Sequence, residues 1–198
     1  MTAFSKPSQP CLGFLTVLEN AEHGFLGGYL LLNAAGRPLE FHCTAPIRAS
    51  RTQEILYGPT LRPFLFGEQI GQTLLTKSKL SPLVVFTDSE PTLAVREFTD
   101  IPVVCVLGAT PVTLTRSASE GTALGPATLT RRVSEGIGCC FQFQLATNQV
   151  AVANGYSNDE QLIRATWPPQ ADHLDLLEPF DRIREALDEA QRSARQAA

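Results

Sequence analysis

The sequence predicts an α/β protein with some α+β character, in which a mixed β-sheet carries helices. Two unbroken apolar runs, at residues 83–87 and 101–107, flank a segment whose composition suits a helix. Unbroken apolar runs are typical of strands that are buried on both faces, as in parallel sheets. The connection between the runs is long enough for a parallel crossover, which needs about a dozen residues or more. We therefore predict a βαβ unit at the centre of the sheet.

The N-terminal part of the chain predicts an antiparallel meander joined to this unit. We expect its strands at residues 12–18, 29–33 and 38–44. In the third strand apolar and polar residues alternate, which is typical of a half-buried antiparallel strand. We expect its apolar face, with Leu39, Phe41 and Cys43, to point into the core.

Two helices are expected between the meander and the central unit. Ser50 suits the N-cap of a short helix over 51–57. A longer helix over about 60–79 has a predicted buried stripe, because apolar residues recur there every four positions. Its stripe consists of Phe66, Ile70 and Leu74. Gly67 and Gly71 lie beside the stripe and indicate that another backbone packs closely against this helix.

The C-terminal residues, 178 to about 195, predict the clearest helix of the chain. Phe180, Ile183 and Leu187 recur at steps of three and four and form an apolar stripe. Docking on the protein's own sheet is the default interpretation. The alternative is an interface, in which this stripe pairs with a partner's helix or with a second copy of the chain.

Residues 109–138 differ in composition from the rest and contain a duplication. The segment Thr113–Gly121 recurs with few changes as Thr128–Gly136, and both copies have little apolar surface to bury. This segment resembles the dispersed low-complexity peptides that some bacterial genomes insert into unrelated proteins. We predict a disordered tail over 1–10 and a single domain over 11–198 that this insertion interrupts.

Composition narrows the classes of function. The net charge is −4 and the pI is near 5.4, which argues against a general nucleic-acid binder. No apolar run approaches the roughly 20 residues that span a bilayer, and the N-terminus lacks the apolar core of a signal peptide, so we expect a cytoplasmic protein without a membrane partner. The five cysteines form no Cys-x-x-Cys pair, and no metal site is predicted.

The end of the first central run is the best candidate for a functional site. Ligands of open parallel sheets collect beyond the carboxyl ends of the strands, where Asp88, Ser89 and Glu90 lie. Asp88 or Glu90 is a candidate catalytic base or cation ligand, and Ser89 is a candidate ligand-binding residue. The alternative is structural, because the same residue types favour a helix N-terminus.

Two further candidates are weaker in chemical terms. His42 lies on the polar face of its strand, where it is a candidate base, or otherwise a solvent-facing histidine. Arg48 and Arg51, near the start of the short helix, are candidates for binding an anionic group or for forming surface ion pairs.

These observations leave two hypotheses of different classes. The first is a non-catalytic interaction or scaffolding module that binds a protein partner or itself, through Phe180, Ile183 and Leu187. The alternative is a small-molecule or nucleotide-binding enzyme with an acidic site at Asp88 and Glu90. The sequence indicates no cofactor for either.

Overall fold

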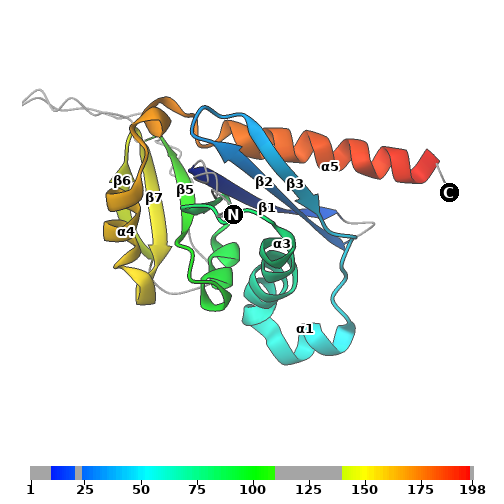
Figure 1. The fold of residues 1–198 in the computed structure, drawn as a ribbon. Coiled ribbons are helices and arrows are strands. Elements are labelled where there is room, and N and C mark those ends of the chain that lie inside the picture. Colours follow the sequence, from blue (N-terminus) through cyan, green and yellow to red (C-terminus); the bar gives the residue numbers. More distant parts are fainter. Residues whose placement is uncertain (1–9, 21–23, 110–139, 197–198) are drawn as a thin grey trace, which may run out of the picture.

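A seven-stranded mixed sheet forms the centre of the computed structural model, which describes residues 10–20, 24–109 and 140–196 (Figure 1). Its strand order is β3-β2-β1-β4-β5-β7-β6. The strands are β1 (Cys11–Asn20), β2 (Gly24–Asn33), β3 (Pro38–Cys43), β4 (Val85–Thr87), β5 (Val103–Ala109), β6 (Cys140–Leu145) and β7 (Asn148–Ala153).

Parallel pairing is confined to the middle of the sheet. β4 lies between β1 and β5 and pairs with both in parallel. On either side the sheet continues as antiparallel ribbons, β1-β2-β3 and β5-β7-β6. This arrangement confirms the predicted mixed sheet, with its N-terminal meander and central crossover.

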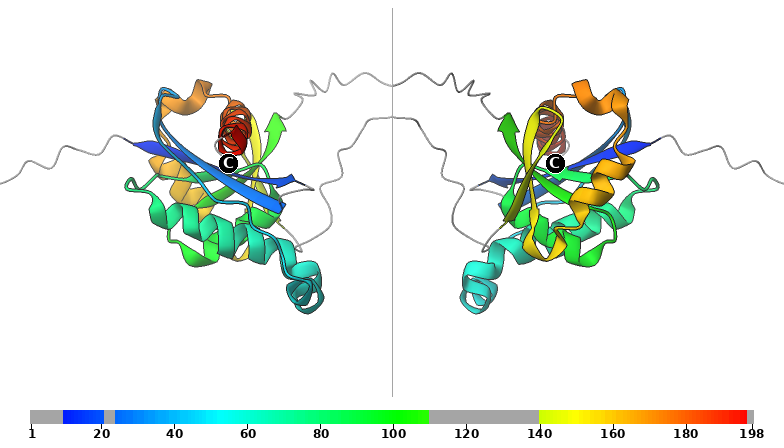
Figure 2. Two further views of the ribbon diagram at one scale, coloured as in Figure 1. Left: turned by 90° about the vertical axis from the view of Figure 1, so that its right-hand side faces the viewer. Right: turned by 90° about the vertical axis from the view of Figure 1, so that its left-hand side faces the viewer.

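Helices cover both faces of the sheet (Figure 2). One face carries α5 (Glu178–Gln196), together with α4 (Asp159–Thr166) and η5 (Pro169–His173). The other face carries the helical run from 58 to 77 and the 3-10 helix η3 (Glu90–Phe98). The helical run is divided into η1 (Gly58–Thr60), α2 (Leu61–Pro63), the π-helical η2 (Phe64–Gly71) and α3 (Gln72–Lys77).

Each face has its own apolar core because both faces of β1, β2 and β4 are apolar. On the α5 side, the Phe14 ring packs 5.3 Å from the Phe86 ring and 5.7 Å from the Phe180 ring, measured between centroids. On the opposite side, Ile70 and Leu74 of the predicted stripe are fully buried. The helix that carries this stripe was predicted correctly, apart from its π-helical turns.

Gly67 and the backbone of η3 are in close contact. A Cβ atom at Gly67 would lie 2.7 Å from Ala94 Cβ and 2.8 Å from Val95 N. The predicted close approach of another backbone is therefore confirmed, and η3 supplies it.

The short helix α1 (Arg51–Tyr57) begins as expected. Ser50 Oγ accepts a hydrogen bond from the Gln53 N–H, and the Gln53 side chain accepts one from the Ser50 N–H. This reciprocal capping box fixes the first turn although the helix buries none of its residues.

The third strand differs from the prediction in the face that it buries. Leu39 and Phe41 are 40% and 39% exposed, whereas Glu40 and His42 are half-buried. Phe41 pairs with Leu30 and points to the α5 side, but α5 packs over β1 and β2 and leaves the edge strand β3 uncovered. The alternation of the strand was predicted correctly, but the prediction of which face points into the core was wrong.

The predicted tail over 1–10 and the predicted insertion over 109–138 lie almost wholly outside the described residues.

Candidate functional site

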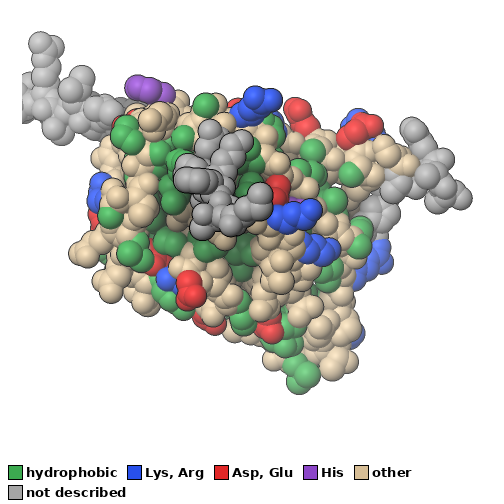
Figure 3. Space-filling view, in the orientation of Figure 1, with side chains coloured by type: hydrophobic (Ala, Val, Ile, Leu, Met, Phe, Trp, Pro, Cys, Tyr) green, Lys and Arg blue, Asp and Glu red, His purple; other side chains and the backbone are tan. Residues whose placement is uncertain are grey.

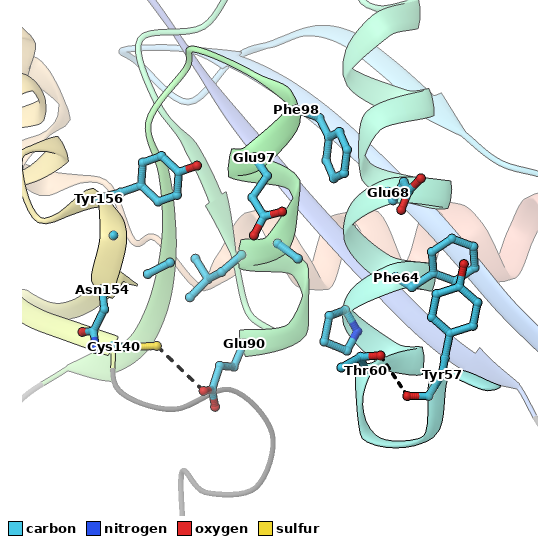
Figure 4. A pocket seen from close by; sticks show the side chains of 15 residues that line it. Tyr57, Thr60, Phe64, Glu68, Glu90, Glu97, Phe98, Cys140, Asn154 and Tyr156 are labelled. Carbon is cyan, nitrogen blue, oxygen red and sulfur yellow. Dashed lines mark hydrogen bonds between the residues drawn. The ribbon is translucent and has the colours of Figure 1, made fainter. Parts of the chain in front are cut away.

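A cavity of about 580 Å³ lies between the helical run that follows α1, the 3-10 helix η3, and the exit of strand β7 (Figure 4). The segment after β7 is η4 (Asn154–Tyr156), a single 3-10 turn. The cavity is lined by Tyr57, Thr60, Pro63, Phe64, Glu68, Glu90, Leu93, Ala94, Glu97, Phe98, Cys140, Ala153, Asn154, Gly155 and Tyr156.

Aromatic side chains stand on opposite sides of this cavity. The Tyr57 and Phe64 rings are stacked with their centroids 4.1 Å apart. Tyr156 comes from η4 across the cavity, and Figure 4 shows it facing the helices. Thr60 Oγ1 donates a 2.8 Å hydrogen bond to the Tyr57 carbonyl, which fixes the turn after α1. The cavity thus offers flat apolar faces at both ends.

Three carboxylates give the cavity its charge. Glu90 and Glu97 project from η3, and Glu68 projects from η2. Among the described residues that line the cavity, none is Lys, Arg or His. The lining therefore has hydrogen-bond acceptors and negative charge around an apolar floor of Leu93 and Ala94.

Glu90 is the one predicted site residue that lines the cavity. Its Oε1 atom lies 3.8 Å from Cys140 Sγ, which donates a weak hydrogen bond to it. This contact joins η3 to the first residue of β6, which is close in space but far along the chain.

Asp88 faces different neighbours. Its Oδ1 atom accepts a 2.7 Å hydrogen bond from Thr16 Oγ1 of β1, and Oδ2 is paired with Arg184 of α5. Asp88 does not line the cavity, so Asp88 and Glu90 do not form one acidic site. The strand-end hypothesis is corrected in this respect, because α5 supplies the counter-charge of Asp88.

Ser89 precedes η3 but does not cap it through its side chain. Its N–H is 3.3 Å from Thr87 Oγ1, and its carbonyl accepts the Thr92 N–H at 3.1 Å. Ser89 therefore contributes backbone contacts at the start of η3, and its ligand-binding role stays a prediction.

His42 is paired with a carboxylate on its own strand. His42 Nε2 lies 3.1 Å from Glu40 Oε2, which also accepts hydrogen bonds from Ser78 Oγ and the Lys79 N–H at 3.1 Å each. Burial would raise the pKa of Glu40, but these hydrogen bonds outweigh it and lower that pKa. The group ties β3 to the end of α3, away from the cavity.

The two candidate arginines do not line the cavity either. Arg48 is exposed, and Arg51 forms an exposed 2.9 Å ion pair with Glu54. The same helix exposes Ile55 and Leu56. Figure 3 shows hydrophobic side chains at the outer end of α1, where it projects from the body.

The predicted interface residues are part of the core. Phe180, Ile183 and Leu187 are at most 1% exposed, and Ile183 and Leu187 contact Gly28 of β2. The default interpretation, docking on the protein's own sheet, describes α5. These side chains have no free surface for a partner helix.

No group of three or more His, Cys, Asp or Glu suited to a metal ion occurs among the described residues. Within the same part of the chain, no helix is long and apolar enough to cross a membrane.

Sequence reasoning missed most of the cavity. Tyr57, Phe64, Glu97 and Tyr156 belong to segments that were treated as helix surface or loop. Helical spacing does not relate Tyr57 to Phe64, because Gly58, whose φ is 49°, ends α1 between them. No spacing in the sequence relates them to Tyr156.

Comparison with known proteins finds likenesses among solved structures. No protein-family profile and no characterised protein matches the chain by sequence. A crystal structure of Ciona intestinalis endonuclease V (D234N) in complex with a 23mer DNA matches with a TM-score of 0.34 and 13% identity. The match covers 48% of this chain and 44% of that protein, so this chain spans less than half of the enzyme's length.

This likeness corrects two expectations. The matched structure is an enzyme bound to DNA, and not a scaffolding module. The expectation that nucleic acid is an unlikely partner, which was based on net charge, is therefore corrected. We withdraw the non-catalytic interaction module, with its protein partner or self-association, and its proposed contact residues Phe180, Ile183 and Leu187 are buried in the core. The acidic enzyme site is withdrawn because Asp88 and Glu90 face different neighbours. At this TM-score the likeness assigns neither a reaction nor a site to the chain.

Proposed function

We propose that the cavity binds a nucleobase, a planar nitrogen-containing ring that carries N–H donors. The observation that carries this proposal is the combination of aromatic rings at both ends of the cavity with the carboxylates of Glu68, Glu90 and Glu97 in its lining. The rings suit the flat faces of a base, and the carboxylates suit its polar edge.

The size of the cavity supports a ligand of this kind. Ligand pockets enclose about 300–1,000 Å³, and this cavity has about 580 Å³. It therefore has room for a base together with an attached sugar.

The stacked pair Tyr57 and Phe64 supplies the first part of the binding energy. Stacking of a base on an aromatic side chain contributes about 1–3 kcal/mol per base. Because the two rings already lie 4.1 Å apart, they support one another, and the exposed side of the pair is in place before a ligand arrives.

The carboxylates determine which bases are preferred. An ionised carboxylate only accepts hydrogen bonds, so it suits the exocyclic amino group of cytosine, adenine or guanine. Uracil and thymine present carbonyl oxygens at the corresponding position, which the carboxylates repel. Phosphate is repelled as well, so the phosphates of a nucleotide or strand lie outside the cavity.

An organic ammonium ion is a second candidate ligand. The same three carboxylates attract a cation, and the aromatic faces at both ends of the cavity suit one as well. Salt separates the two candidates, because attraction between exposed charges is screened and base stacking depends on salt much less.

The test is a calorimetric titration with cytidine, adenosine, guanosine, uridine and benzyltrimethylammonium, followed by short single-stranded oligonucleotides. We expect saturable binding of the amino-bearing nucleosides, weaker binding of uridine, and loss of binding in Tyr57→Leu. Glu97→Gln should weaken binding, whereas Glu189→Gln, on exposed α5 surface, should leave it unchanged.

Thiol labelling locates the ligand. In a Cys139→Ser background, a bound nucleoside should protect Cys140 from alkylation, with the exposed Cys43 as internal reference. If only the ammonium ion binds, or if nucleosides bind equally well to Tyr57→Leu, the proposal is overturned. Tighter binding of oligonucleotides than of nucleosides would identify a strand as the source of the base.

A further inference from the structure

Arg96 connects the two walls of the cavity. It belongs to η3, whose next two residues, Glu97 and Phe98, line the cavity from one side. Its side chain reaches Tyr156 and Asp159, which lie at the opposite wall and just behind it. We infer that Arg96 is the positioning residue of this site and sets the place of the Tyr156 ring; this inference rests on the proposed function.

Four contacts hold the guanidinium group. Nε donates to Asp159 Oδ2 at 2.8 Å and Nη2 donates to Asp159 Oδ1 at 3.1 Å, while Nη1 donates to the Thr99 carbonyl. The fourth contact is with the Tyr156 ring, whose centroid lies 4.4 Å from the guanidinium carbon. The group is thus fixed both in its plane and across its face.

Burial makes this arrangement rigid. The Arg96 side chain is 14% exposed and that of Asp159 is 3% exposed. A bidentate Arg–carboxylate pair of this kind keeps a fixed orientation. A lysine side chain does not reproduce it, because its ammonium group is carried by a flexible chain. The pair joins positions 63 residues apart in the sequence, so it fastens η3 to the segment that begins α4.

The electrostatic role of Arg96 is limited by its partner. The hydrogen bonds that Arg96 donates to Asp159 raise the pKa of Arg96, against the opposing effect of burial, so Arg96 stays charged and lies against a carboxylate that offsets its charge. Arg96 is not among the cavity-lining residues. Its effect on a ligand therefore passes through the Tyr156 ring, and not through charge in the cavity.

The test is a double-mutant cycle of Arg96→Lys and Tyr156→Leu on nucleoside affinity. We expect Arg96→Lys to weaken cytidine or adenosine binding about tenfold, and to have no further effect in a Tyr156→Leu background. If Arg96 only stabilises the fold, its effect is the same in both backgrounds, and that result overturns the inference.

Arg164→Lys is the matched control. Arg164 also pairs with a carboxylate, that of Glu160 at 2.8 Å, and its guanidinium carbon lies 5.6 Å from the Phe143 ring centroid. None of these three residues lines the cavity. Its substitution should leave nucleoside affinity unchanged.

A measurement without ligand separates this inference from the proposed function. Nitration by tetranitromethane should modify Tyr156 faster in Arg96→Lys than in the wild type, with Tyr57 as internal reference. Faster nitration without nucleoside binding upholds the positioning role and overturns the proposed ligand. Unchanged nitration of Tyr156 overturns the positioning role, whatever binds.

Discussion

Gly67 and Ala94 pack backbone against backbone, with the missing side chain of Gly67 leaving room for the 3-10 helix that Ala94 belongs to. A Cβ atom at Gly67 would lie 2.8 Å from the Ala94 carbonyl carbon. The contact brings η2 against η3, and both elements line the cavity. The shape of the candidate site therefore depends on a residue that has no side chain.

Gly67→Ala should destabilise the protein by up to about 2 kcal/mol. Alanine favours a helix by about 1 kcal/mol over glycine, but overpacking typically costs about 1–3 kcal/mol. The free energy of unfolding in urea measures the balance. Gly155→Ala, where a Cβ meets nothing within 4 Å, is the control and should change little. A more stable Gly67→Ala protein would contradict the close contact.

Asp159→Asn should destabilise the protein by about 3–5 kcal/mol, the range typical when one partner of a buried ion pair is removed. Asp159 is almost fully buried, and its loss leaves the Arg96 guanidinium buried without a counter-charge. Denaturant unfolding measures this change. Glu160→Gln, which removes the exposed partner of Arg164, should alter stability by well under 1 kcal/mol. Similar losses of stability in the two variants would mean that the buried ion pair contributes no more to stability than the exposed pair.

Tyr29→Phe should leave stability unchanged or raise it by about 1 kcal/mol. Tyr29 is fully buried, and among the described residues its hydroxyl has no hydrogen-bond partner. Burial raises the pKa of Tyr29 far above its ordinary value, so the hydroxyl stays neutral. Thermal unfolding measures the effect. A clear loss of stability would indicate a hidden partner, such as a buried water molecule.

Glu40 should make stability depend on pH in the acidic range. Its pKa is lower in the folded protein than its ordinary value of 4.5, so the folded state favours the ionised carboxylate. The stabilisation is present above about pH 5 and is lost as the pH falls through the lowered pKa. Glu40→Gln should therefore be less stable than the wild type at pH 7 and nearer to it at pH 3. Glu185→Gln, at an exposed position, serves as control. A stability difference between Glu40→Gln and the wild type that grows toward pH 3 would contradict this prediction.

The predicted elements were mostly found because their signals are local. Ser50 and Gln53 form a cap within one turn, and Phe66, Ile70 and Leu74 recur at helical spacing. The inward face of β3 was not predictable in this way. Whether Phe41 is covered depends on where α5 packs, and α5 is more than a hundred residues further along the chain.

The candidate site was less accessible to sequence reasoning than the fold. Glu90 was singled out as a residue at a strand end, and it lines the cavity. Asp88, two residues earlier, was singled out for the same reason and faces Arg184. The two side chains point to different neighbours, and the sequence does not show which helices pack on which face of the sheet. Tyr156 lines the cavity and contacts Arg96, which lies 60 positions earlier in the sequence.

The parallel centre of the sheet also has a consequence for how quickly the chain folds. β1 pairs with β2, the next strand in the sequence, but its other neighbour is β4, where Gly13 lies beside Val85. Pairing β1 with β4 closes a long loop of the chain, which costs conformational entropy before the strand contacts form. Such long-range pairings therefore slow folding. We expect the β1–β2 hairpin to form first and β4 to join it late. Leu30→Ala should then slow folding, whereas Phe86→Ala should mainly speed unfolding.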